Sequence, residues 1–143
     1  MNKRTRIILS VCLTVLLVFG IGGYAHVSNY YQADETALEA MAYQTDSVQA
    51  EQDGNVIWFV PEDPTAGLIL YPGGKVEYTA YAPLLRACAE NGILCALVRM
   101  PGNLAVLDAN AADGLQQEHP EITTWYIAGH SLGGAMAAGY AAA

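Results

Sequence analysis

The fold is decided at residues 123–143, TTWYIAGHSLGGAMAAGYAAA. Residues 123–128 form a short apolar run that is typical of a buried strand, whereas residues 132–143 are rich in alanine and favour a helix. Between the two runs stands GHSLG at residues 129–133. This is a G-x-S-x-G motif directly after an expected strand and directly before an expected helix, which is the context that the motif requires.

The two glycines of this motif have a steric role. An abrupt strand-to-helix turn strains the backbone of its central residue, and only small neighbours avoid colliding with it. Gly129 and Gly133 provide that space around Ser131. Ser131 would then lie at the amino end of the helix, where the Leu132 N–H is the natural first donor to an oxyanion. The alternative left open is a simple turn in which Ser131 only caps the helix.

Upstream of this motif, short apolar runs alternate with helical patterns from residue 67 onward. The alternation predicts an α/β fold, a mostly parallel sheet with flanking helices that bury both of its faces. Asp53-Gly54 separates two earlier runs and predicts a hairpin with its turn at Gln52–Asn55. The expected parallel strands are 67–71, 93–98 and 123–128, and the expected helices are 78–91, 103–118 and 132–143.

A second glycine-rich loop, PGGK at residues 72–75, follows the first of these parallel strands. It is expected at the same carboxyl edge of the sheet as Ser131, where folds of this class bind ligands. The Gly74 N–H can therefore be the second oxyanion donor. The loop lacks the spacing of phosphate-binding loops, which disfavours a nucleotide site. Three tyrosines near these loops either line an acyl pocket or only pack: Tyr71, Tyr78 and Tyr81.

Over residues 55–143 the chain resembles the α/β-hydrolase superfamily, and within it the membrane-anchored bacterial proteins grouped with dienelactone-hydrolase-like enzymes. The resemblance rests on PGG at residues 72–74, RMP at 99–101 and GHSLGG at 129–134. Dienelactone hydrolases differ in one respect, because they use a cysteine as nucleophile where this chain has Ser131.

The resemblance implies a serine hydrolase that acts on an ester or related small-molecule acyl substrate. Ser131 attacks the carbonyl, a histidine takes its proton, an acid orients that histidine, and the N–H groups of Leu132 and Gly74 hold the oxyanion. In this superfamily the chain order is serine, acid, histidine. Neither an acid nor a histidine follows Ser131 in this chain.

None of the upstream candidates replaces that histidine. His130 is adjacent to Ser131 in the turn, where neighbouring side chains diverge, and it is interpreted as packing. We therefore expect residues 1–143 to be the amino-terminal part of a longer enzyme, with residues 47–143 a partial α/β-hydrolase domain and the isolated chain inert toward p-nitrophenyl acetate. The other groups considered, interpreted as remote or solvated, are His26, Lys75, Asp108, Asp113 and His119.

The amino-terminal part predicts a membrane segment. A basic head at residues 1–6, expected in the cytoplasm, precedes the uncharged apolar run 7–25, which at about 1.5 Å per residue spans roughly 28 Å, close to a bilayer core. An uncleaved anchor is favoured over a signal peptide cleaved near Ala25, and the positive-inside rule places the domain outside the membrane. Residues 26–46 are expected to form a helical stalk.

Composition excludes other classes of function. Residues after Arg6 contain three basic and 14 acidic side chains, a formal charge of −11, which opposes binding to nucleic acid. No metal or organic cofactor is expected, and Cys88 and Cys95 are interpreted as small buried side chains, with a disulfide between them as the alternative. The alternative function is a non-catalytic membrane-tethered α/β module derived from a hydrolase.

Overall fold

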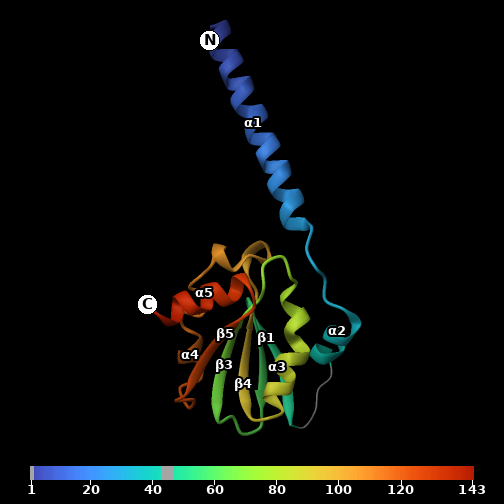
Figure 1. Cartoon of the computed structure of the whole chain (residues 1–143), viewed down its shortest axis with the longest axis vertical. Helices are drawn as coiled ribbons and strands as arrows, with labels where there is room; N and C mark the ends of the chain where they lie inside the picture. The colour runs from blue at the N-terminus through green and yellow to red at the C-terminus, as the bar shows by residue number, and fades with distance from the viewer. Residues whose placement is uncertain (1, 43–46) are drawn as a thin grey trace.

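A five-stranded mixed sheet forms the centre of the domain (Figure 1). The computed structural model describes residues 2–42 and 47–143, so the end of the expected stalk lies outside the described residues. The strand order is β1-β2-β4-β3-β5, with β3, β4 and β5 mutually parallel and β1 and β2 antiparallel to their neighbours. The strands are β1 (Val48–Asp53), β2 (Val56–Pro61), β3 (Ala66–Tyr71), β4 (Ile93–Val98) and β5 (Trp125–Gly129).

The sheet confirms the expected α/β class and its parallel strands. The β1–β2 hairpin turns at Gly54, whose φ of 52° lies in the left-handed region that glycine adopts without strain. The β4 run is central and apolar throughout, and Leu94–Val98 are buried on both faces of the sheet. Because β3 and β5 run parallel to β4 or to each other, their carboxyl ends and the loops that follow them meet at one edge of the sheet.

Two helices cover opposite faces of the sheet. Helix α3 (Ala82–Ala89), which follows the 3-10 turn η1 (Tyr78–Tyr81), packs Leu85 against Phe59 and its neighbours. Helix α5 (Leu132–Ala141) contributes Ala137 to the cluster on the other face, around Ile69. Helix α3 ends at Ala89, and the turn that follows it reaches Gly92, which has a φ of 80° and donates its N–H to Ala89 O.

The prediction of a helix over residues 103–118 is wrong. In its place the chain forms two 3-10 turns, η2 (Pro101–Asn103) and η3 (Ala105–Leu107), and only a short helix α4 (Leu115–Glu118). The phenol of buried Tyr71 holds the segment between them, since its oxygen accepts from Ala112 N–H at 2.8 Å and donates to Ala109 O at 3.0 Å. The carboxylates at residues 108 and 113 therefore lie on an irregular segment and not on a helix flank.

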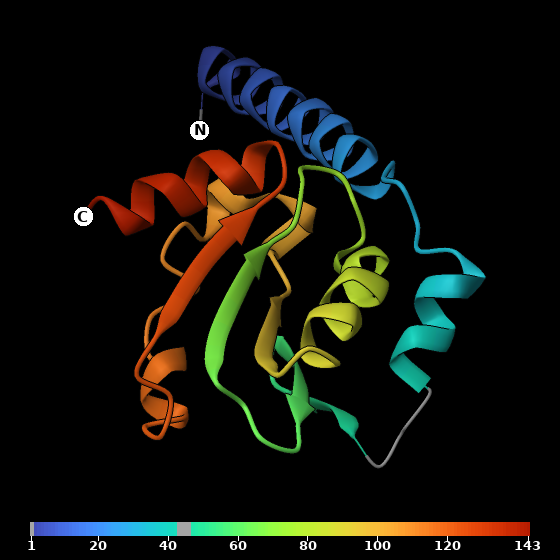
Figure 2. The same cartoon turned by 60° about the horizontal axis from the view of Figure 1, so that its bottom comes forward.

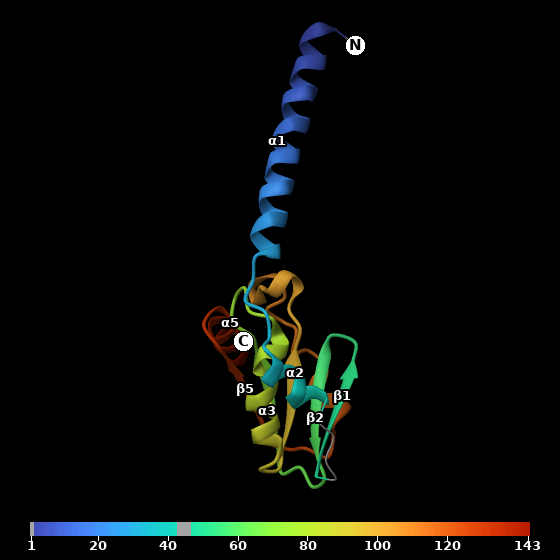
Figure 3. The ribbon, with the colours of Figure 1, turned by 90° about the vertical axis from the view of Figure 1, so that its right-hand side faces the viewer.

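Helix α1 (Lys3–Ser28) projects away from the domain (Figures 1 and 3). It has 26 residues, none of them buried, and it is long and apolar enough to cross a membrane, a test that a signal sequence near the N-terminus also passes. Its last turn reaches η2, where a Cβ on Gly102 would lie 2.9 Å from Val27 Cγ1. In Figure 3 the loops after β4 lie directly below the end of α1.

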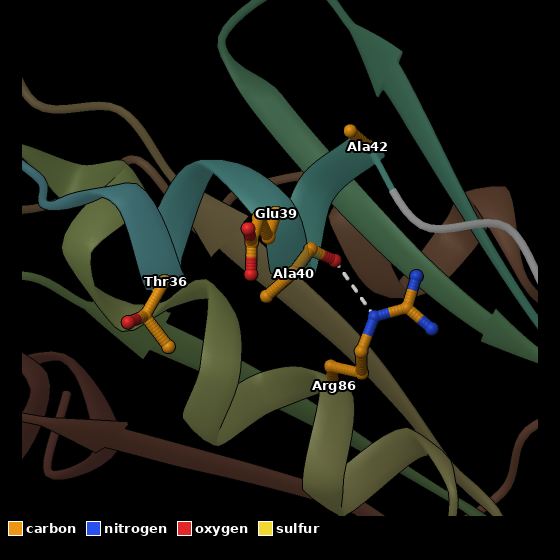
Figure 4. Close-up of a pocket in the computed structure, with 5 residues that line it drawn as sticks. All are labelled: Thr36, Glu39, Ala40, Ala42 and Arg86. Carbon is orange, nitrogen blue, oxygen red and sulfur yellow. Dashed lines mark hydrogen bonds between the residues drawn. The ribbon is translucent and has the colours of Figure 1, made fainter.

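The linker after α1 runs along the domain to helix α2 (Glu35–Ala42), as Figure 2 shows. Tyr31 forms a parallel bridge with Val76 on the way. Helix α2 packs on α3, and the guanidinium Nε of buried Arg86 donates to Ala40 O at 2.7 Å (Figure 4). This part of the expected stalk is therefore docked on the domain.

Candidate active site

The turn between β5 and α5 has the strained geometry that the sequence predicts. Ser131 has φ 51° and ψ −117°, a combination that an L-residue adopts only at a cost of about 1–3 kcal/mol. Its carbonyl accepts from Ala135 N–H at 3.1 Å, so α5 begins immediately after this residue. The side chain of Ser131 is exposed at the carboxyl edge of the sheet.

Backbone strain is concentrated at this edge. Among the described residues, three that are not glycine have a positive φ: Lys75 at 59°, Asn103 at 56° and Ser131 at 51°. They follow β3, β4 and β5 respectively, so each of the three parallel strands is followed by one strained residue. Lys75 N–H donates to Asn103 O at 2.8 Å, which joins two of these loops. Clusters of strained residues mark functional sites more often than ordinary turns.

The two motif glycines are required by close backbone approach. A Cβ on Gly129 would lie 2.5 Å from the carbonyl carbon and oxygen of Gly133, across the turn. A Cβ on Gly133 would overlap the carbonyl oxygens of Tyr71 and Pro72, at the end of β3. Any side chain at either position would therefore push α5 away from the sheet and move Ser131.

His130 is held by Tyr81, for which the sequence leaves open a role in lining a pocket or in packing. Its Nδ1 lies 2.8 Å from Tyr81 Oη, and the same oxygen accepts from Gly73 N–H at 3.0 Å. The His130 backbone N–H donates to Tyr71 O at 3.1 Å. The phenol of Tyr81 thus joins the β5–α5 turn to the loop after β3, and the tyrosine–glycine–histidine contact fixes the two loops relative to each other.

The two residues expected to supply the oxyanion donors, Gly74 and Leu132, are in contact. A Cβ on Gly74 would be 3.1 Å from Leu132 Cδ2 and 3.4 Å from Leu132 Cβ. Within residues 2–42 and 47–143, neither the Gly74 N–H nor the Leu132 N–H has a hydrogen-bond partner. Both N–H groups are therefore free to bind an anionic oxygen, and the N-terminal dipole of α5 favours negative charge there.

No base or orienting acid comes to Ser131 from the part of the chain that the structure describes. The hydroxyl of Ser131 makes no hydrogen bond to these residues. His119 packs on Trp58 at a ring distance of 4.5 Å and lies 3.2 Å from Glu121. Asp113 accepts instead from the Tyr140 phenol at 3.0 Å. These groups form contacts of their own, and none of them bonds to Ser131.

Burial raises the pKa of two side chains, Tyr71 and Cys95. Desolvation raises the pKa of the Tyr71 phenol, directly before the PGGK loop, to about 12, so the phenol keeps its proton while it holds residues 109–112. Desolvation likewise raises the pKa of the Cys95 thiol to about 12. Cys88 and Cys95 are free thiols in this structure. The described residues contain no group of three or more His, Cys, Asp or Glu placed to hold a metal ion.

Comparison with known proteins identifies a family. Residues 67–143, from β3 to the end of α5, match the model of the alpha/beta hydrolase family. This range contains both glycine-rich loops and the turn at Ser131. No curated protein and no solved structure shows a significant match.

Proposed function

We propose that this chain, which belongs to the α/β-hydrolase family, carries the nucleophile and oxyanion hole of a serine hydrolase that acts on an ester or related acyl substrate. The observation that carries the proposal is the backbone of Ser131, at φ 51° and ψ −117° between β5 and α5. That conformation lifts the hydroxyl away from the helix that follows, where a carbonyl carbon can reach it.

In the proposed reaction, Ser131 Oγ attacks the acyl carbonyl and the N–H groups of Leu132 and Gly74 receive the oxyanion. The close approach of the Leu132 side chain to Gly74, and the lack of hydrogen-bond partners for the two N–H groups among the described residues, support this role. One such donor contributes about 2.7–4 kcal/mol of transition-state stabilisation in hydrolases of this type. His130 is not assigned as the base, because the Ser131 hydroxyl makes no hydrogen bond to its ring among the described residues.

We propose that the histidine and the acid of the triad come from a segment outside residues 1–143. Two observations support this. The Ser131 hydroxyl has no partner among the described residues. Among the strands that the structure describes, β5 pairs only with β3, and Tyr126 is 59% exposed, which leaves an edge where a further parallel strand would pair and bury apolar surface.

We also propose that the chain is anchored in a membrane and that it belongs to one subfamily of the α/β-hydrolases. Residues 7–25 would anchor the chain with the domain outside the membrane and the basic head inside, the alternative being a segment cleaved near Ala25. Within the family, the loops at residues 72–74 and 99–101 favour the membrane-anchored dienelactone-hydrolase-like bacterial proteins, with Ser131 where dienelactone hydrolases themselves have a cysteine.

Hydrolysis of p-nitrophenyl butyrate by the full-length protein tests the function. We expect Ser131→Ala to lose activity to the uncatalysed background, while the exposed control Ser28→Ala keeps it. Equal rates for wild type and Ser131→Ala would refute the assignment.

A second function, the non-catalytic tethered module, is favoured by the absence of a base near Ser131 among the described residues. It predicts that folded full-length protein hydrolyses no ester in a Ser131-dependent way.

A further inference from the structure

We propose that the substrate is an acyl ester of a lipid in the same membrane that anchors the chain, delivered to Ser131 at the bilayer surface. This inference rests on the proposed serine-hydrolase function and on the anchor at residues 7–25. It adds a substrate class that neither the fold nor the family match assigns.

A short series of contacts links the anchor to the site. Val27, in the last turn of α1, lies against Gly102 of η2, and a Cβ on Gly102 would also be 4.0 Å from Leu107 Cδ1. On the other side of these turns, Leu104 and Leu132 both lie within 4 Å of a Cβ built on Gly74. The end of the anchor and the proposed oxyanion hole are therefore separated only by the η2–η3 turns.

The depth of this edge follows from helix geometry. If the hydrocarbon core ends near residue 25, Val27 lies only about 3 Å beyond it, at roughly 1.5 Å per residue. The polar headgroup layer is about 5–7 Å thick on each side of the bilayer. Gly102, which Val27 contacts, therefore lies at the level of the headgroups, with the carboxyl edge of the sheet directly beneath them.

The linker fixes this arrangement. Tyr31 N–H donates to Lys75 O at 2.8 Å, and Glu77 N–H donates back to Tyr31 O at 2.8 Å. The Glu77 carboxylate accepts from Ala33 N–H at 2.9 Å. The two backbone bonds form the isolated parallel bridge between Tyr31 and Val76, and Val76 belongs to the loop that carries Gly74. The domain is thereby held against the anchor with Ser131 toward the membrane.

The side chains at this edge suit a lipid surface. Val106, Leu107 and Tyr31 are 55%, 61% and 76% exposed, although all three have large apolar surfaces. The edge also carries Lys75 and Arg99, two of the three basic residues that follow Arg6. Glu77 and Asp108 lie beside Lys75 and Leu107 in the chain, so the basic pair offsets these acidic groups and the edge is close to neutral.

Two substitutions of the same kind test the proposal in the full-length protein reconstituted in phosphatidylcholine vesicles. Leu107→Glu places a charge on the membrane-facing edge, and Leu38→Glu places one on α2, at a leucine that is 53% exposed. Each protein is assayed on a fluorogenic diacyl phospholipid in the vesicle and on soluble p-nitrophenyl butyrate. We expect Leu107→Glu to lower the ratio of the lipid rate to the soluble rate about tenfold, because the variant no longer gains the free energy of burying an apolar side chain in the bilayer interface. Leu38→Glu should leave this ratio unchanged.

Two results would overturn the inference: an equal ratio in the two variants, or wild-type hydrolysis of the soluble ester without hydrolysis of the vesicle lipid. Hydrolysis of neither ester would refute the proposed function and with it the lipid substrate, and a readout independent of activity then tests whether this edge faces the bilayer. In a Cys12→Ser, Cys88→Ser background, a fluorophore on Leu107→Cys should be quenched by nitroxide-headgroup lipids at least severalfold more than one on Leu38→Cys. Equal quenching would show that this edge does not face the bilayer.

Discussion

Gly133 and Gly139 lie on the same helix, α5, and adding the same methyl group to each has opposite expected effects on stability. A Cβ on Gly133 would overlap two backbone carbonyl oxygens, those of Tyr71 and Pro72. A Cβ on Gly139 meets nothing within 4 Å. Because a backbone atom cannot rotate away as a side chain can, Gly133→Ala must displace α5 from the end of β3.

The magnitudes follow from these contacts. Overpacking of this kind costs about 1–3 kcal/mol, and we expect the upper part of that range because both obstacles belong to the backbone. Gly139→Ala should instead stabilise the protein by roughly 0.5–1 kcal/mol, since alanine is the better helix former and restricts the unfolded chain. The difference between the two variants should therefore be about 3–4 kcal/mol.

Urea unfolding of the full chain in detergent, followed by the fluorescence of Trp58 and Trp125, measures both variants. The midpoint should fall for Gly133→Ala and rise for Gly139→Ala at an unchanged slope. A midpoint for Gly133→Ala within the equivalent of about 0.5 kcal/mol of wild type would refute the close approach of α5 to β3.

Three further outcomes are expected. Tyr81→Phe removes the acceptor of Gly73 N–H and the partner of His130 Nδ1, and should cost about 1–2 kcal/mol in urea unfolding; no loss would mean that these hydrogen bonds do not form in solution. Ser131→Gly should be about 1–2 kcal/mol more stable than Ser131→Ala, because only glycine relieves the positive φ, and equal stabilities would show an unstrained turn. The pKa of the Tyr71 phenol is near 10 in the unfolded chain but about 12 in the folded one, so its contribution to stability is complete below pH 10 and is lost as the pH rises toward 12. The urea midpoint of Tyr71→Phe should therefore fall less than that of wild type between pH 10 and 12. An identical fall in both proteins would show that Tyr71 does not cause the loss of stability.

The sequence predicts the turn at Ser131 well because its causes are local. A strand, a strained residue between glycines and a helix follow one another within residues 125–141, and each depends on near neighbours. Periodicity likewise predicts the strands, because β4 is apolar throughout and β3 nearly so.

The expected helix at 103–118 fails for reasons that are not local. Ala109 and Ala112 bond to the phenol of Tyr71, more than thirty residues earlier in the chain. Asn103, the first residue of the expected helix, takes a positive φ, and its carbonyl accepts from Lys75 N–H. Helix propensity in this segment is overridden by partners that pattern reasoning does not reveal.

The joining role of Tyr81 is missed for the same reason. Its phenol contacts Gly73 and His130, and the second of these lies 49 residues away. Spacing alone places Tyr81 on a helical segment near the PGGK loop, which is equally compatible with packing. Only the topology, with β3 beside β5, brings the tyrosine to the turn.

If Ser131 is an activated nucleophile in the complete protein, it should react with a fluorophosphonate probe. Folded full-length protein is treated with the probe and its peptides are analysed by mass spectrometry. We expect a single phosphonate adduct on the peptide that contains Ser131, and no adduct in Ser131→Ala. Folded protein that takes up no probe, or takes it up equally in Ser131→Ala, would show that Ser131 is not the nucleophile.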